Sequence, residues 1–143
     1  MAHLGKAISI DAPPEAVWTV LGDLAATSEW LPGTVAAWTD GSIRICETAD
    51  GGEIREEITD YSPERRTYRY RHLQLPLPIE NSTGKFAVEG QAGDQATVVL
   101  EADFDALDPA KEAEVEQMYG GALDQALESL KRRVERGVSW QAA

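Results

Sequence analysis

Hydrophobic and polar positions alternate along most of the chain, and a helical spacing replaces the alternation near its end. Residues 3–10 alternate and predict a strand, whereas residues 13–21 carry apolar side chains at helical spacing. Residues 24–31 favour a second short helix. Six further alternating segments follow, at residues 35–40, 43–48, 53–61, 65–73, 79–89 and 96–105. The turns between them are short, so we expect consecutive strands to pair antiparallel.

The last long segment, from Pro109 to about Arg136, has the pattern of an amphipathic helix. Asp108 is placed to cap its first turn, and proline is tolerated at the first helical position. The apolar positions that recur every three or four residues are Val115, Met118, Ala122, Ala126, Leu130 and Val134. At ~1.5 Å per residue this helix is long enough to lie across a whole sheet.

The length of 143 residues suits one domain, and we expect residues 1–143 to form a single one. The net charge of -12 disfavours nucleic acid and anionic membrane surfaces as partners. The single cysteine, Cys46, excludes a disulfide within the chain. No run is apolar enough to span a bilayer, and no signal-peptide core precedes the first strand. We therefore expect a cytoplasmic protein, either a monomer or a homodimer.

Motifs of several enzyme classes are missing from the sequence. No glycine-rich phosphate loop follows a strand, and there is no Gly-x-Ser-x-Gly nucleophile motif. His3 and His72 are the only histidines, which excludes a histidine-rich zinc site. No motif indicates a cofactor, and we expect none. For Cys46 the favoured interpretation is a buried, inert thiol.

Short motifs spread over essentially the whole chain carry a family resemblance. They are Ile10-Asp11-Ala12-Pro13, Val17-Trp18 with Leu21, Trp30-Leu31-Pro32-Gly33, Gly41-Ser42-Ile43-Arg44, Asp50-Gly51-Gly52-Glu53, Tyr68-Arg69-Tyr70 and Leu77-Pro78-Ile79. Together with the order of the elements, they resemble the START/Bet v 1-like superfamily, most closely its bacterial polyketide cyclase/dehydrase-like branch. One departure lies in residues 36–41, where relatives often have Gly-x-Gly-x-Gly before the arginine.

The resemblance implies an α+β helix-grip fold. In this fold a curved, seven-stranded antiparallel sheet wraps a long C-terminal helix, two short helices follow the first strand, and a cavity lies between sheet and helix. It also implies ligand binding in that cavity, although the superfamily includes carriers, receptors, cyclases and chaperone-associated domains. Fold alone therefore leaves several functions open.

Strand parity predicts which side chains line the cavity. Apolar side chains hold the even positions of residues 53–61, 79–89 and 96–105, so the even face turns inward. That face also carries Glu56 and Phe86. In residues 65–73 the arginines hold the odd positions 69 and 71, which leaves the even positions inside. Those positions are Tyr68, Tyr70 and His72.

The strand at residues 43–48 is ambiguous, because either Ile43 and Ile45 or Arg44 and Cys46 could face inward. The resemblance favours Arg44, since relatives turn a basic residue at this place into the cavity. A buried Arg44 and Glu56 would each need a partner. We expect Arg44 or a tyrosine hydroxyl within hydrogen-bond reach of Glu56. If Arg44 is that partner, the pKa of Glu56 should fall.

Two further groups complete the candidate site. By resemblance, Trp30 and the proline-rich loop around Leu75 and Leu77 close the mouth of the cavity. On the long helix, Met118, Tyr119 and Ala122 are expected to face the cavity, with the glycine pair 120–121 leaving room beside it. The candidate ligand-binding residues are thus Trp30, Arg44, Glu56, Tyr68, Tyr70, His72, Leu75, Leu77, Phe86, Met118, Tyr119 and Ala122.

Three functions remain open at this point. The first is binding of a small hydrophobic ligand, aromatic or polycyclic, because tyrosine offers a ring and a hydroxyl to such a ligand. The second is a polyketide aromatase/cyclase, with Glu56, His72 and Tyr70 as candidate catalytic groups. The third is a protein-interaction domain with a vestigial cavity. Each candidate also has a purely structural interpretation: an Arg44–Glu56 ion pair, tyrosines that fill the core, and a histidine without a role.

Overall fold

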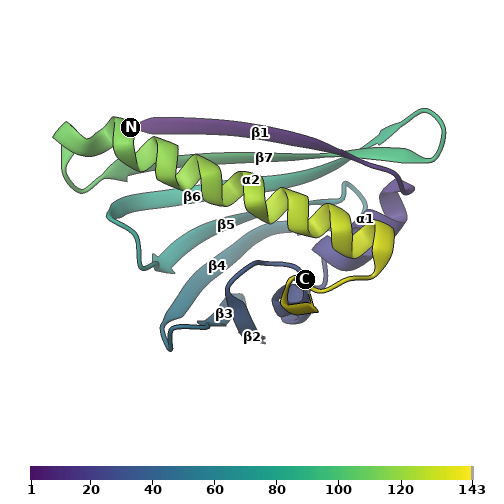
Figure 1. Ribbon diagram of the computed structural model, residues 1–143, viewed down its shortest axis with the longest axis horizontal. Helices are drawn as coiled ribbons and strands as arrows, with labels where there is room; N and C mark the ends of the chain where they lie inside the picture. The colour runs from purple at the N-terminus through teal and green to yellow at the C-terminus, as the bar shows by residue number, and fades with distance from the viewer. Residues whose placement is uncertain (143) are drawn as a thin grey trace.

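Residues 1–142, which the computed structural model describes, form one curved sheet with a long helix across its concave face (Figure 1). The strands are β1 (Ala2–Ile10), β2 (Thr34–Asp40), β3 (Ile43–Thr48), β4 (Glu53–Ser62), β5 (Thr67–Gln74), β6 (Ile79–Gln91) and β7 (Gln95–Ala106). Their order in the sheet is β1-β7-β6-β5-β4-β3-β2, and every neighbouring pair is antiparallel. The predicted helix-grip architecture is confirmed.

The helices follow the predicted order with small differences at their ends. They are α1 (Pro14–Leu21), the 3₁₀ helices η1 (Leu24–Glu29) and η2 (Pro109–Lys111), α2 (Glu112–Arg136) and η3 (Trp140–Ala142). The predicted second short helix is thus a 3₁₀ helix, and the long helix starts with a 3₁₀ turn. As predicted, Asp108 caps that turn, since its carboxylate accepts a hydrogen bond of 3.0 Å from the N–H of Ala110.

The buried stripe of α2 differs from the predicted one by a small rotation. Its buried residues include Val115, Tyr119, Leu123, Ala126, Leu127 and Leu130. The prediction that Met118 faces the interior was wrong, because its side chain is 46% exposed. Neighbouring helical positions lie about 100° apart, so burying Tyr119 turns Met118 toward solvent.

The glycine pair at positions 120 and 121 of α2 does not leave room beside the cavity, contrary to the prediction from the sequence. A Cβ on Gly120 would lie 3.6 Å from Nζ of Lys6, on β1, and a Cβ on Gly121 would meet nothing within 4 Å. Both positions therefore have room for a Cβ, and neither glycine lies on the cavity lining.

Irregular registers help to curve the sheet. The β4–β5 register shifts between Thr59 and Ser62, and the β6–β7 register shifts between Glu80 and Thr83. Each shift contains a residue with positive φ, Asp60 at 49° and Asn81 at 52°. Such bulges bend a strand and increase its twist. They help the sheet to fold around α2 instead of lying flat against it.

Candidate functional site

A cavity of about 430 Å³ lies between the concave face of the sheet, helix α2 and three loops. Its lining comes from strands β2 to β7, helix α2 and the loops around residues 30–33, 49–50 and 75–77. The residues are Trp30, Leu31, Pro32, Gly33, Thr34, Arg44, Thr48, Ala49, Asp50, Ile54, Glu56, Tyr70, His72, Leu75, Leu77, Phe86, Leu100, Tyr119, Ala122, Leu123, Gln125 and Ala126. Most of this lining is apolar, and the polar side chains are concentrated on β3, β4 and β5 and the facing turn of α2.

The charged end of the cavity is a row of three residues on adjacent strands. Arg44 pairs with Glu56 across β3 and β4, and Glu56 pairs with His72 across β4 and β5. A register shift between Arg55 and Glu56, which leaves Leu73 unpaired on β5, sets His72 directly opposite Glu56. Because all three side chains point to the concave face, they meet inside the protein.

Arg44 and Glu56 form a buried ion pair. Nε of Arg44 donates to Oε1 of Glu56 at 3.0 Å, and Nη2 lies 3.0 Å from the same oxygen. Nη1 donates to the hydroxyls of Thr27 and Tyr68, both at 3.2 Å. Both charged side chains are at most 6% exposed. The predicted inward orientation of Arg44 and its contact with Glu56 are therefore present in the structure.

Electrostatics keeps this pair ionised. Burial acts to raise the pKa of Glu56, but the charge of Arg44 and the hydrogen bond from His72 outweigh it and lower the pKa to about 2. For Arg44, burial disfavours the charge, while Glu56 more than compensates and raises the pKa further above its usual value. A carboxylate that stays ionised at neutral pH is an anchor and a poor proton donor.

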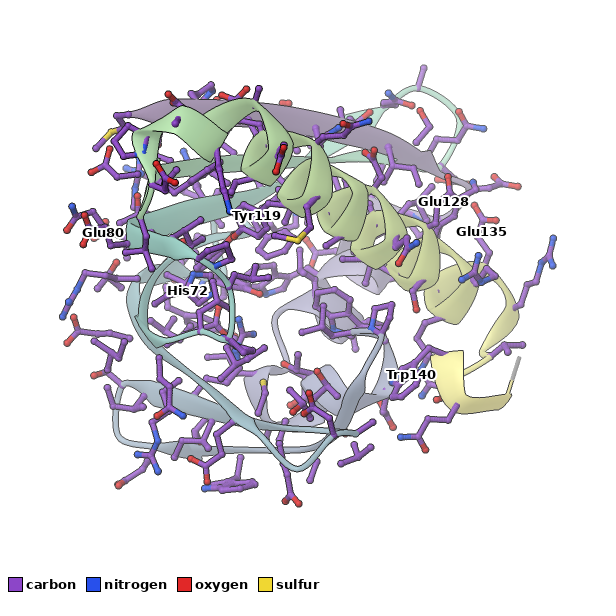
Figure 2. All side chains as sticks on the ribbon, turned by 60° about the vertical axis from the view of Figure 1, so that its left-hand side comes forward. His72, Glu80, Tyr119, Glu128, Glu135 and Trp140 are labelled. Carbon is purple, nitrogen blue, oxygen red and sulfur yellow. The ribbon has the colours of Figure 1, made fainter. Side chains whose placement is uncertain are left out.

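A group of further polar side chains lies beside the ion pair. Nδ1 of His72 is 2.7 Å from Oγ of Ser82, and its Nε2 is 3.4 Å from Oε2 of Glu56. Tyr119 projects from α2 toward the sheet, where His72 lies on β5 (Figure 2). Burial raises the pKa of both Tyr70 and Tyr119, and each hydroxyl influences the titration of the other. Both phenols are therefore protonated at neutral pH.

Gly84 fixes the position of Tyr70. The two residues are direct partners across β5 and β6, and a Cβ on Gly84 would overlap the phenol ring. Tyr70 thus lies flat across a strand that has no side chain at this point, and only glycine allows this approach. The ring fills the space beside His72, with the two ring centroids 5.1 Å apart.

Part of the cavity reaches the surface. Exposed or half-exposed residues form its rim: Leu31, Pro32, Ala49, Asp50, Leu75, Leu77, Ala122 and Gln125. Leu75 and Leu77 were predicted at the mouth and lie there. Trp30 was also predicted at the mouth, but it is only 1% exposed and forms a wall deeper inside. Ser129 on α2 donates to the carbonyl of Trp30 at 2.5 Å and holds this wall against the helix.

Ten of the predicted binding residues line the cavity, and two do not. Those on the lining are Trp30, Arg44, Glu56, Tyr70, His72, Leu75, Leu77, Phe86, Tyr119 and Ala122. Met118 is exposed on α2, for the reason given above. Tyr68 is fully buried behind the cavity wall, because its hydroxyl accepts from Arg44 and its ring packs on Phe86. What these residues bind or catalyse stays a prediction.

Sequence reasoning missed part of the lining. Leu123 and Ala126 were assigned to the helix core, and Thr48, Asp50 and Gln125 were not singled out. Strand parity did place Ile54 and Leu100 on the inward, even-numbered face, so these two could have been named from the sequence. Nothing in the local pattern indicates that the turn around Asp50 and the side chain of Gln125 meet at one rim.

Cys46 does not contribute a side chain to the cavity, and the described residues show no cluster suited to a metal ion. Burial raises the pKa of the Cys46 thiol to about 11, so it is protonated at neutral pH, and Cys46 is not on the cavity wall. Within residues 1–142, no group of three His, Cys, Asp or Glu side chains is arranged to hold a metal ion. Over the same residues, no helix is long and apolar enough to cross a bilayer.

The sheet, the helix that it grips and the cavity between them define a helix-grip fold. The chain belongs to the family described as polyketide cyclase / dehydrase and lipid transport, whose model matches residues 1–135. No curated protein sequence matches the chain.

Solved structures agree with this assignment at the level of the fold. The protein XoxI from Bacillus cereus is 23% identical, with a TM-score of 0.85 over 95% of this chain and 97% of that one. A Thermobifida fusca protein is 28% identical, with a TM-score of 0.81 over 95% of each chain. The ZhuI aromatase/cyclase from Streptomyces sp. R1128 is 20% identical, with a TM-score of 0.69 over 95% of this chain and 97% of that one.

Proposed function

We propose that the protein binds a small, largely apolar ligand in the cavity between the sheet and α2. The observation that carries the proposal is an open cavity of about 430 Å³ with apolar walls and one polar end. This volume lies in the range of small-molecule sites, and such sites combine hydrophobic walls with a few polar groups that fix orientation. A vestigial cavity would instead be expected to be filled by side chains.

The walls favour a ring-bearing ligand. Trp30 and Phe86 meet edge to face with ring centroids 6.1 Å apart, and Tyr70 lies 6.0 Å from Phe86. Aromatic side chains in such arrangements offer faces and edges to a further ring. The proline-rich loop that carries Leu75 and Leu77 adds aliphatic surface at the rim.

A second candidate function is aromatase/cyclase activity on a polyketide in the same cavity. The observation in its favour is the buried group of Tyr70, His72 and Tyr119, which offers protonated phenols to polarise a carbonyl and an imidazole to accept a proton. The family description and the Streptomyces aromatase/cyclase are consistent with it. Glu56 is unsuited to the acid role, because Arg44 keeps it ionised.

Binding is tested with N-phenyl-1-naphthylamine, a neutral probe whose fluorescence rises in apolar surroundings. Titration of the protein should give saturable enhancement. Ala122→Trp places a large side chain at the rim and should weaken binding at least tenfold. Ala113→Trp is the matched control, since Ala113 is exposed on the same helix and not on the lining. Equal binding by both variants would mean that the probe does not enter this cavity.

The enzyme alternative needs turnover as well as binding. Incubation with an aromatic-polyketide precursor that carries a poly-β-ketone should give a cyclised product, detected by mass spectrometry. His72→Gln should then lower turnover while probe affinity is retained. Saturable binding without any product would leave the protein as a binder.

A further inference from the structure

The charged end of the cavity has no positive charge to spare. Both Nε and Nη2 of Arg44 are directed at Oε1 of Glu56, and Nη1 is occupied by Thr27 and Tyr68. The two buried charges cancel inside the protein. Asp50 then adds a carboxylate at the rim, and the whole chain carries a net charge of -12. An anionic ligand group would therefore meet the carboxylates of Glu56 and Asp50 and an arginine that is already paired.

Acceptors and neutral donors, by contrast, are available there. Among residues 1–142, the polar contact shown for Oε2 of Glu56 is Nε2 of His72 at 3.4 Å, whereas a carboxylate oxygen can accept two hydrogen bonds. The phenols of Tyr70 and Tyr119 are 4% and 5% exposed and lie on the lining. Burial keeps both phenols protonated, and because the two hydroxyls hydrogen-bond to each other, one phenol hydrogen of the pair remains to donate to a ligand.

A hydroxyl group suits this arrangement in both directions. It can donate to Oε2 of Glu56 and accept from one of the two phenols, and it brings no charge that must be desolvated. A carboxylate of the same overall shape can accept from the phenols, but it faces the carboxylate of Glu56 and must leave water beside an arginine whose N–H groups already bind Glu56, Thr27 and Tyr68.

We propose that the cavity selects neutral aromatic ligands that carry a phenol or enol hydroxyl, and that it discriminates against carboxylates of the same shape. This inference rests on the proposed ligand-binding function and narrows it to a chemical class.

The direct test compares three probes of one ring system at pH 7: 2-naphthol, 2-naphthoate and 2-methylnaphthalene. Each displaces N-phenyl-1-naphthylamine from the wild-type protein. We expect 2-naphthol to bind at least tenfold more tightly than 2-naphthoate. Equal affinities, or a preference for the carboxylate, would overturn the inference, while binding of 2-methylnaphthalene would preserve the proposed function. If none of the three binds, both the inference and the proposed function fail.

Glu56→Gln tests whether the ion pair causes the selectivity. The substitution leaves the charge of Arg44 unmatched beside the cavity, so the preference for 2-naphthol over 2-naphthoate should fall at least tenfold. Glu57→Gln is the matched control, because Glu57 is the adjacent residue on β4, pairs with Arg71 on the outer face and should leave the preference unchanged. A folded Glu56→Gln protein with wild-type selectivity would overturn the inference.

A second variant covers the case in which Glu56→Gln fails to fold, as judged by circular dichroism. Replacing both phenols, with Tyr70→Phe and Tyr119→Phe, removes the donors and keeps the rings. Affinity for 2-naphthol should drop at least fivefold, while that for 2-methylnaphthalene stays the same. An unchanged affinity for 2-naphthol would exclude recognition of the hydroxyl by these phenols and would overturn the inference.

Discussion

The two halves of the sheet bury their concave faces in different ways. On β7 the inward residues Val98, Leu100, Ala102 and Phe104 are all fully buried and apolar. On β3, β4 and β5 the corresponding face carries Arg44, Glu56, Tyr70 and His72. Helix α2 packs chiefly on β1 and β7, as Figure 1 shows, and the lower strands curve away from it.

The difference shows how one helix can serve both as core and as cavity wall. Where α2 touches the sheet, apolar side chains from both elements fill the space. Farther from α2, on β3 to β5, polar residues bind one another across the strands, and a cavity remains between them and the helix. The apolar half of the sheet, where α2 packs on β1 and β7, forms the core. The polar half, on β3 to β5, borders the cavity.

The largest expected effect comes from breaking the ion pair in the polar half. Arg44→Met leaves Glu56 buried without its partner and should cost about 3–5 kcal/mol of unfolding free energy, measured by urea denaturation. The double variant Arg44→Met/Glu56→Leu removes both charges and should recover most of that loss. A double variant no more stable than Arg44→Met would show that the cost does not come from the unpaired charge.

In the apolar core, Leu130→Ala should destabilise the protein by about 2–5 kcal/mol. Leu130 on α2 is fully buried, and its neighbours cannot fully close the space that the missing side chain leaves. Leu130 is absent from the cavity lining, so affinity for N-phenyl-1-naphthylamine should be unchanged when the folded fraction is taken into account. A tenfold loss of affinity would mean that the two halves are not separable.

Stability should also depend on pH through Glu56. Its pKa in the folded protein, about 2, lies below the unfolded value near 4.5, so the folded state is favoured while the carboxylate is ionised. This stabilisation, of a few kcal/mol, is fully present above about pH 5 and is lost as the pH falls toward 2. Urea denaturation across this range should show a smaller acid-induced loss for Arg44→Met/Glu56→Leu than for the wild type. Identical pH profiles would show that Glu56 has an ordinary pKa in the folded protein.

The smallest effect on stability is expected at the rim. Leu77 is half-buried, and Leu77→Ala should cost only about 1 kcal/mol while it weakens probe binding several-fold. Leu107→Ala is the control, because Leu107 is 58% exposed and lies outside the cavity. Equal probe affinity in both variants would show that Leu77 does not contact the bound probe.

Much of the site could be predicted because the side chains of a strand alternate between two faces, so burying the apolar ones decides which polar ones also point inward. Ile54 and Ile58 had to be buried, and this alone turned Glu56 inward. Arg44 was harder, since isoleucines and polar residues compete for the two faces of β3. The structure shows why the pattern was ambiguous: Arg44 and Cys46 are buried on the concave side, and Ile45 is buried too. Only the resemblance favoured the right face.

Helical spacing constrained the site less well. Met118 and Tyr119 fit the apolar period of α2 almost equally, and a rotation of one residue exchanges them. Their order is decided by where β1 and β7 meet the helix, with Gly120 facing Lys6. The local sequence does not contain the contact with β1, because β1 and α2 are more than a hundred residues apart.

The sequence by itself determined the elements, their order, the capped start of the long helix and the side of the strands on which Glu56, Tyr70 and His72 lie. These follow from periodicity and from the cost of burying unpaired polar groups, which are local properties. Tertiary structure decided how far α2 stands from β3–β5, which loops meet at the rim and which partner neutralises each charge. These depend on sheet curvature and on the distance between remote segments, and no run of neighbouring residues encodes either quantity.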